Sequence, residues 1–239
     1  PAAVYIVAPH TCQTIPLLHA LLAKRLSSSA AAVDLLKKVQ LLQFFDMAGL
    51  VESIAEVNES IYQLSQVDFR RDQMPPNSLK VHHEPQYVVL IEGLASTLSA
   101  TQRRSGLVQA NALLAGLTRS ITQLSKLPGR PLVLISVPID VRNGRETGQT
   151  GETYHQRKGQ GLQLESAFSG PNWESYTLAC GSMILSQTLA GSLDQLIHIH
   201  DALRRATSRR PDTRLPIQCV IEVMKDRVGN LTGVWAPWQ

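Results

Sequence analysis

The segment 87–137 opens with the apolar run Tyr87-Val88-Val89-Leu90-Ile91, passes through a long helical pattern, and closes on a second apolar run, Leu132-Val133-Leu134-Ile135-Ser136-Val137. Short aliphatic runs without polar alternation predict strands that are buried on both faces. Two such strands joined by a helix predict a right-handed βαβ unit in a parallel sheet. Glu92 directly follows the first run, so we expect it at the carboxyl edge of the sheet, where such folds bind ligands.

The connecting helix is expected at 107–127, after small residues and a polar stretch at 93–106. Its apolar residues recur every three or four positions, which predicts one face packed on the core. These residues are Leu107, Ala110, Leu114, Leu117, Ile121 and Leu124. Pro128-Gly129 predicts the end of the helix.

The bulk composition predicts one α/β domain over residues 1–239, because 44% of its residues are hydrophobic. The formal net charge of +4 permits nucleic-acid binding without arguing for it alone. Three scattered cysteines without a CxxC pair indicate neither a disulfide framework nor a zinc module, and favour a reducing compartment. No apolar run approaches the ~18 residues that would span a bilayer, so no membrane partner is expected.

The segment 4–14 has the order of a phosphate-binding loop, with a strand at 4–7, a loop, and a helix from about residue 15 to 26. Aligned with the pattern GxxxxGK[ST], Val7 and Cys12 replace the two glycines, Gln13 replaces the lysine, and Thr14 remains. Glycines let successive N–H groups curl around phosphate oxygens, and the lysine supplies the cation. We therefore expect neither tight nucleotide binding nor hydrolysis, and no cofactor or metal.

Residues 27–32 read as a low-complexity connector, 39–45 as a strand ending at Asp46, and 49–64 as a helix. Asp46 could be catalytic, although a helix-capping or turn-forming aspartate is the commoner case. The polar segment 66–85 is expected to be a loop. Its pair His82-His83 could bind metal, but no acidic or cysteine partner lies at ligand spacing, which favours a solvated loop.

A long loop is expected at 140–161, followed by a helix at 173–189. Its cationic residues are Arg142, Arg145, Arg157 and Lys158. Further along, 195–200 predicts a strand with His198 and His200 on one face. These histidines could form a metal pair, but sheet-face histidines beside an acid such as Asp201 are commoner.

Arginines then concentrate between two expected strands, which predicts a basic loop and an anionic partner. They are Arg204, Arg205, Arg209, Arg210 and Arg214. Strands at 217–223 and 234–235 follow, so the late elements predict an antiparallel edge on the parallel sheet.

With these elements in place, the chain resembles the RecA-like P-loop NTPase core of the eukaryotic strand-exchange recombinase and its paralogues. The resemblance covers the element order of nearly the whole chain, and it is most specific at 109–137, which resembles the helix and strand after the Walker B strand. It puts Glu92 in place of the Walker B aspartate and Ala48 in place of the catalytic glutamate. It also puts 140–161 in place of the second DNA-binding loop.

The departures from the family pattern agree with each other, since the phosphate loop and the catalytic base are both degenerate. The resemblance therefore implies a non-catalytic recombinase paralogue of the Shu-complex type, a nuclear pseudo-ATPase acting in homologous recombination and DNA repair. It implies a hetero- or homo-oligomer with other paralogue subunits or the recombinase itself. It further implies contact with single-stranded or branched DNA through two basic loops, with Arg142, Arg145, Arg157, Lys158, Arg204, Arg205, Arg209 and Arg210.

Two other interpretations remain open. The Elongator complex contains RecA-fold subunits that lack nucleotide motifs and form a ring that binds transfer RNA; 109–137 favours the recombinase paralogues over these. An enzyme on the same scaffold could use Glu92, Asp46 and the histidines, although no pair of them has a spacing that requires it.

Overall fold

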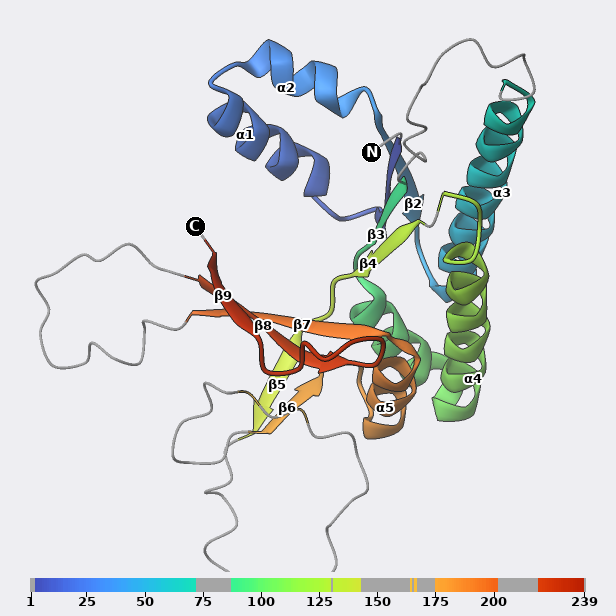
Figure 1. Ribbon diagram of the computed structural model, residues 1–239. Coiled ribbons are helices and arrows are strands. Elements are labelled where there is room, and N and C mark those ends of the chain that lie inside the picture. Colours follow the sequence, from blue (N-terminus) through green and yellow to red (C-terminus); the bar gives the residue numbers. More distant parts are fainter. Residues whose placement is uncertain are drawn as a thin grey trace, which may run out of the picture. The chain divides into compact units, whose positions relative to one another are not determined.

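The computed structural model describes residues 3–71, 87–129, 131–142, 164, 166, 175–201 and 219–238. The chain forms two compact units, Pro1–Val137 and Pro138–Gln239 (Figure 1). None of the helices in the described ranges is both long enough and apolar enough to cross a bilayer.

The first unit is an α/β sandwich around a parallel sheet. Its elements are β1 (Ala3–Pro9), α1 (Thr14–Leu26), α2 (Ser29–Leu36), β2 (Val39–Phe44), α3 (Met47–Arg71), β3 (Tyr87–Ile91), α4 (Leu94–Leu124) and β4 (Leu132–Ile135). All strand pairs are parallel and the order is β2-β1-β3-β4. The α/β class and the parallel sheet expected from the sequence are confirmed.

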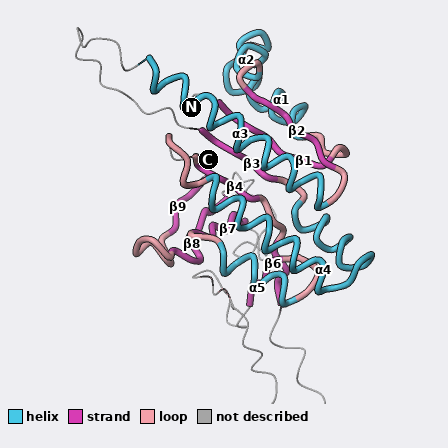
Figure 2. Tube along the Cα trace, turned by 90° about the vertical axis from the view of Figure 1, so that its right-hand side faces the viewer, coloured by secondary structure: helices cyan, strands magenta, loops and turns pink. Residues whose placement is uncertain are grey.

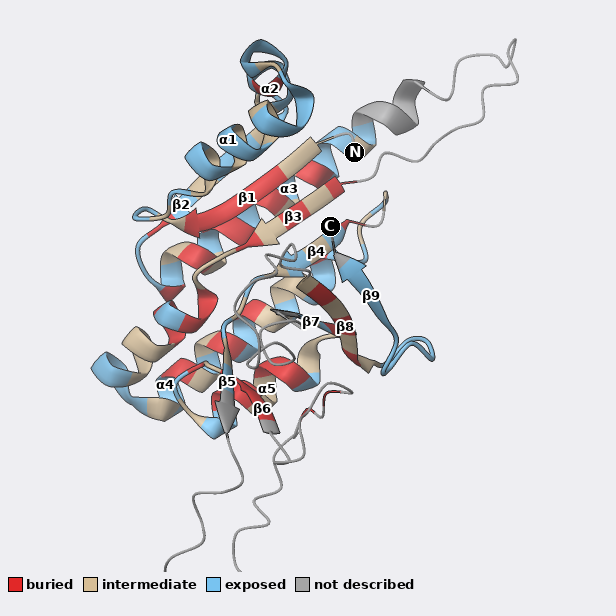
Figure 3. Cartoon of the chain, turned by 90° about the vertical axis from the view of Figure 1, so that its left-hand side faces the viewer, coloured by how far each residue is buried: buried red, intermediate tan, exposed pale blue. Residues whose placement is uncertain are grey.

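The core of this unit lies between the sheet and the helices α3 and α4, which pack against each other (Figure 2). The central strand β1 is buried from Tyr5 to Ala8, as the red segment of Figure 3 shows. The Tyr5 hydroxyl lies 2.9 Å from Ser60 Oγ, which ties β1 to α3. Burial of these aliphatic and aromatic side chains is the main stabilising term of the unit.

The expectation that β4 is buried on both faces is wrong. Leu132 and Leu134 are 55% and 42% exposed. The register aligns them with Val88 and Leu90, on the face opposite the fully buried Val89. Because β4 is the edge strand of the sheet, the side chains of Leu132 and Leu134 have neighbours from only one adjacent strand, β3, on this face.

Two helical stretches were expected to be irregular. The segment 27–32 largely belongs to α2, because Ser28 Oγ accepts a hydrogen bond from Ala31 N–H at 3.3 Å and alanines favour the helix. The residues before 107 are also helical, and Gly106, with φ 83° and ψ 169°, separates them from the helix expected at 107–127. The apolar stripe of that helix is confirmed, since Ala110, Leu114 and Leu117 are fully buried.

The second unit contains antiparallel strands and a short helix. Its elements are β5 (Ile139–Arg142), β6 (Ser175–Leu178), α5 (Met183–Ser192), β7 (Gln195–Asp201), β8 (Cys219–Asp226) and β9 (Trp235–Trp238). β5 pairs with β6, while β7, β8 and β9 form a separate three-stranded sheet. The antiparallel order of the late strands is confirmed, but they form their own sheet instead of an edge on the parallel one.

The prediction of a helix at 173–189 is wrong for residues 175–178, which form the strand β6. Gly181, at φ 89°, ends this extended stretch. Ser182 then caps α5, because its Oγ accepts a hydrogen bond from Leu185 N–H at 3.3 Å. At the other end of α5, Lys225 Nζ donates to the carbonyls of Ala190 and Leu193, where a cation stabilises unpaired helix carbonyls.

Candidate functional site

The most informative site lies where β1 and β3 run side by side. The strand β1 has β2 as its neighbour along one edge and β3 along the other edge. The chain therefore passes from β1 to one neighbouring strand, β2, and later returns to the opposite edge of β1 as β3. A strand order of 2-1-3-4 makes the gap between β1 and β3 a topological switch point, and open α/β sheets bind ligands beyond the carboxyl ends of the strands at such a point. The residues that follow β1 and β3 therefore form the candidate site.

The loop after β1 is a tight turn. Cys12 N–H donates to the carbonyl of Pro9 at 2.9 Å, and His10 N–H donates to the carbonyl of Phe44 at 3.1 Å. Gln13 immediately precedes α1 and its side chain makes no capping hydrogen bond. Two N–H groups of the turn, those of His10 and Cys12, are thus used for backbone contacts, whereas a phosphate loop points successive N–H groups at its ligand.

Glu92 closes this loop from the neighbouring strand. Its N–H donates to the carbonyl of Val7 at 2.9 Å, which places it at the end of β3. The Thr14 hydroxyl donates to Glu92 Oε2, and the Cys12 thiol donates to the same oxygen at 3.0 Å. The loop, the first residue of α1 and the strand end are therefore joined through one carboxylate.

The electrostatics of the site favour this arrangement. The N-terminus of α1 carries partial positive charge from its unpaired N–H groups, and its first turn contains no acidic residue. The Glu92 carboxylate, hydrogen-bonded to the first residue of α1, supplies the missing negative charge. The start of α1 is therefore matched with an anion that the chain itself supplies.

The turn is also packed tightly against the start of α4. Gly93 has φ +72°, and a Cβ atom built on it would lie 2.2 Å from Pro9 Cγ and 2.7 Å from Pro9 Cδ. Only glycine fits this conformation and this contact. The end of β1 and the turn after β3 therefore touch directly, with no room for a side chain between Pro9 and Gly93.

The sequence pattern assigned five residues to a degenerate nucleotide motif, and the structure brings three of them together, namely Cys12, Thr14 and Glu92. Val7 lies instead within β1, fully buried and paired with Leu42 and Ile91. Gln13 is exposed. The sequence pattern identified the positions, but the hydrogen bonds between them join segments 78 and 80 residues apart, and no sequence signal indicated those bonds.

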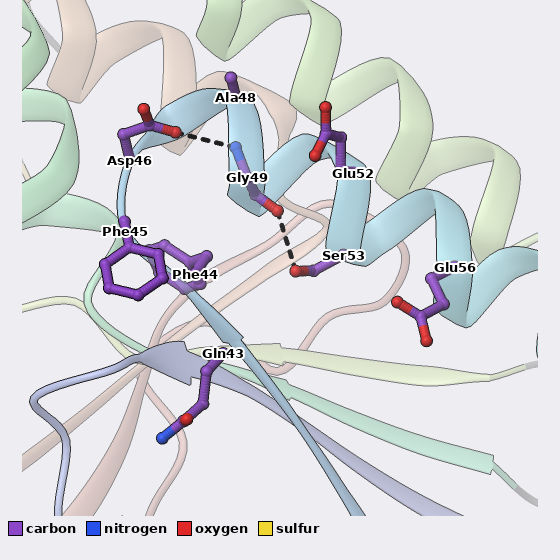
Figure 4. Close-up of a pocket in the computed structure, with 9 residues that line it drawn as sticks. All are labelled: Gln43, Phe44, Phe45, Asp46, Ala48, Gly49, Glu52, Ser53 and Glu56. Carbon is purple, nitrogen blue, oxygen red and sulfur yellow. Dashed lines mark hydrogen bonds between the residues drawn. The ribbon is translucent and has the colours of Figure 1, made fainter.

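Asp46 caps α3, because its Oδ1 accepts a hydrogen bond from Gly49 N–H at 2.9 Å. Ala48, at the position assigned to the catalytic glutamate, is exposed in the first turn of this helix. Both residues line an open hollow of about 520 Å³, and Figure 4 shows their side chains on the first turn of the helix and just before it. Sequence reasoning missed this hollow, which is lined by Gln43, Phe44, Phe45, Asp46, Ala48, Gly49, Glu52, Ser53 and Glu56.

The remaining candidates are the expected metal ligands and the basic residues. Within the described ranges, no group of three histidine, cysteine, aspartate or glutamate side chains is arranged to hold a metal ion. The backbone of Arg142 ends β5, but its side chain lies outside the described residues. The same holds for the whole of His82, His83, Arg145, Arg157, Lys158, Arg204, Arg205, Arg209, Arg210 and Arg214.

Comparison with known proteins returned no match, either to a protein-family model or to a curated sequence.

Proposed function

We propose that this chain is a non-catalytic RecA-fold subunit, a recombinase paralogue of the Shu-complex type. It binds DNA and partner proteins in the nucleus and assists homologous recombination and DNA repair. The proposal that the subunit does not hydrolyse nucleotide rests on the segment between β1 and α1, in which Cys12 and Thr14 both donate hydrogen bonds to Glu92. We call this segment the closed loop. The recombination part is supported by the resemblance of 109–137 and by the order of the elements.

The closed loop argues against ATP as a ligand. A P-loop NTPase holds Mg²⁺ with a loop hydroxyl and a Walker B carboxylate, while a lysine and backbone N–H groups cradle the phosphates. Here the hydroxyl of Thr14 is bound to the carboxylate, and the neutral Gln13 stands where the lysine would be. A triphosphate would meet a carboxylate without a compensating lysine, so its binding would be opposed by like charge.

Loss of the nucleotide has a consequence for assembly. In the family that the chain resembles, nucleotide bridges neighbouring subunits, so a subunit without nucleotide needs constitutive protein contacts. Candidate partners are other recombinase paralogues or the recombinase itself. Trp235 in β9 is 54% exposed, and a large exposed aromatic side chain is a frequent anchor of protein interfaces.

The DNA contact is assigned to the two basic segments, 142–158 and 204–214. Phosphate contacts predict binding that is insensitive to base sequence and weakened by salt. On single strands, the logarithm of the binding constant should fall with the logarithm of the salt concentration by about 0.7 per phosphate contact. Tyr154 is the one aromatic residue in these segments, so base stacking contributes little.

Two measurements on the purified protein and one affinity purification test the proposal. Calorimetry should detect no micromolar affinity for ATP, and fluorescence anisotropy should detect salt-sensitive binding to single-stranded or branched DNA. Replacing Arg204, Arg205, Arg209 and Arg210 with alanine should lower both the DNA affinity and its salt slope. The matched control replaces four exposed cations of the first unit, Lys24, Arg25, Lys37 and Lys38, with the same change in net charge.

Affinity purification from nuclear extract supplies the third measurement. Recovery of recombination factors supports the proposal, whereas recovery of Elongator subunits assigns the chain to transfer-RNA modification. If the arginine variant keeps its DNA affinity and salt slope but loses its partner, the segment 204–214 is a protein contact and its assignment to DNA is wrong.

A further inference from the structure

The open hollow described above lies at the carboxyl edge of the parallel sheet, where β2 ends and α3 begins. Its lining comes partly from the end of the strand and partly from the first turns of the helix. Figure 4 shows the rings of Phe44 and Phe45 on the strand side and the carboxylates of Glu52 and Glu56 on the helix. The volume of about 520 Å³ is within the range of ligand pockets, about 300–1,000 Å³.

An exposed aromatic ring forms one wall of this hollow. Phe45 is 79% exposed, whereas the preceding Phe44 is 1% exposed. The ring of His10, which follows β1, lies 4.4 Å from the Phe45 ring at an interplanar angle of 31°. This contact holds the Phe45 ring at the edge of the sheet while most of its surface faces solvent. Such a ring offers a partner group a large surface for stacking.

The helix side of the hollow carries only negative charge. In the range 47–66, α3 contains Glu52, Glu56 and Glu59 but no lysine or arginine, although the whole chain has a net charge of +4. Glu52 and Glu56 are exposed and lie one turn apart, and like charges at this spacing destabilise a helix. Within the part of the chain that the structure describes, neither glutamate forms an ion pair. A cation from a partner would replace their repulsion by attraction.

Asp46 adds a third carboxylate, but its role is local. Its Oδ1 accepts the hydrogen bond from Gly49 N–H at 2.9 Å, and Ser53 Oγ donates to the Gly49 carbonyl at 2.8 Å. Both bonds serve the first turns of α3. Glu52 and Glu56 are therefore the carboxylates that a partner would engage, and Asp46 contributes its charge to the same hollow.

Carboxylates beside an aromatic ring favour one kind of cation. The guanidinium group of arginine is planar, binds a carboxylate through two parallel N–H bonds and stacks on aromatic faces. The ammonium group of lysine is a compact and strongly hydrated point charge, which matches the carboxylates but gains less from the ring. The charge and the exposed ring of the hollow are thus complementary to arginine in both respects.

We propose that this hollow binds an arginine side chain of a partner protein, with the guanidinium group paired to Glu52 and Glu56 and stacked on Phe45. This inference goes beyond the proposed role in recombination and does not depend on it. All three residues lie in the first unit and outside both basic segments. They give the protein an acidic interaction surface of its own.

The experiment titrates the isotopically labelled full chain with the N-acetyl, N-methylamide derivative of arginine. Nuclear magnetic resonance follows the backbone N–H signals of Gly49, Glu52, Ser53 and Glu56, which should shift and reach saturation. The corresponding derivative of citrulline has the same shape without the charge, and it should bind about tenfold more weakly. The lysine derivative should bind about threefold more weakly, because it gains less from the ring.

Variants of the hollow separate its two contributions. Glu52→Gln and Glu56→Gln should each lower the affinity for the arginine probe about threefold, as expected for a solvent-exposed ion pair. Phe45→Leu keeps an apolar side chain but removes the ring, and it should cause a loss of about the same size. Glu59→Gln is the matched control, because it removes the same charge from the same helix outside the lining. Melting curves establish that each variant is folded.

The outcomes decide between this occupant and others. Saturable shifts at the hollow, with affinity decreasing from arginine to lysine to citrulline, support the proposal. Shifts confined to other parts of the chain, or equal affinities for any two of the probes, overturn it. An equal loss of affinity in Glu59→Gln also overturns it, because the effect would then reflect net charge alone. Shifts of the same signals with protein concentration, without any probe, would assign the hollow to a second copy of the chain instead.

Discussion

The hydroxyl of Thr14, the first residue of α1, donates a hydrogen bond to the carboxylate of Glu92, the residue that follows β3. The sheet brings these residues together because β1 and β3 are adjacent and parallel. In a working P-loop these two positions hold a metal ion and its nucleotide. Here they bind each other, so the contact stabilises the fold at the carboxyl edge of the sheet.

Replacing Glu92 with alanine should therefore destabilise the protein. The change removes the acceptor of the Thr14 and Cys12 hydrogen bonds, and we expect a loss of about 2 kcal/mol in the free energy of unfolding. Urea denaturation followed by circular dichroism measures it. The control is Glu59→Ala, an exposed residue of α3 that accepts one hydrogen bond from Gln63 and should cost at most about 0.5 kcal/mol. Equal losses in the two variants would show that the closed loop contributes no particular stability.

A substitution at Gly93 should be more harmful than one at Gly106. Both residues have positive φ, at +72° and +83°, so alanine is strained at either position by about 1–3 kcal/mol. Only at Gly93 would the new Cβ also collide with Pro9, which adds a further 1–3 kcal/mol or so of overpacking. Gly106, with ψ 169°, has the more strained backbone of the two, so a larger loss for Gly93→Ala in urea denaturation would reflect the collision with Pro9. A smaller loss for Gly93→Ala would contradict the close packing of the two loops.

The three cysteines should differ in reactivity. Cys180 is fully buried, and burial, with a smaller contribution from the charge of Asp140, raises the pKa of its thiol to about 11. At pH 8 only about one part in a thousand of such a thiol is ionised, and the thiolate is the reactive form. Cys12 and Cys219 are partly exposed.

With a disulfide reagent at pH 8, we expect Cys12 and Cys219 to react in the native protein and Cys180 only after unfolding. Labelling followed by peptide mass spectrometry identifies each site, and labelling in urea provides the reference for full reactivity. Rapid native labelling of Cys180 would mean that the second unit opens readily.

The turn at Asp226 predicts a dependence of stability on pH. The hydrogen bond from the N–H of Gly229 is the main cause that lowers the pKa of the Asp226 carboxyl. Desolvation opposes it with a smaller effect, and the N–H groups of Leu231 and Val228 and the Gln195 amide lower the pKa further. A lowered pKa in the folded state means that the ionised form stabilises the fold. This stabilisation is fully present above the ordinary aspartate value of 3.8 and is lost as the pH falls through the lower folded value.

The variant Asp226→Asn removes this titration. In urea denaturation between pH 6 and pH 2, wild type should be the more stable form at the upper end, and the difference should shrink below about pH 4. Asp34→Asn is the control, because Asp34 lies in an exposed pair with Lys37 and should show little difference at any pH. A difference between wild type and Asp226→Asn that stays constant over the whole range would contradict the assignment.

The local pattern of residues was sufficient for several elements. The aliphatic runs predicted β1, β2 and β3, and the spacing of Ala110, Leu114 and Leu117 predicted the buried face of α4. Asp46 was expected to cap a helix or form a turn, and it caps α3. These features depend on interactions between residues close in sequence, or on burial that periodicity reports directly.

Other local expectations failed where tertiary contacts or caps outweighed the pattern. The segment before Leu107 reads as polar, yet it is helical, with Leu94 and Leu98 buried. The start of 173–189 reads as helical, yet Tyr176 and Thr177 pair with β5. In both segments the partner that buries a side chain or accepts a backbone hydrogen bond comes from elsewhere in the chain.

The sequence by itself determined the α/β class and the charge of the basic segments, and it predicted a turn between the first strand and the first helix. Only the tertiary structure decided that β1 lies beside β3, that the last strands form a separate sheet, and that Ser166 reaches Glu222. The reason is that propensity and periodicity act over a few residues, whereas strand pairing is chosen by the packing of whole elements. The hydrogen bond from Thr14 to Glu92 joins residues 78 positions apart, and it forms because the sheet places their two strand ends together.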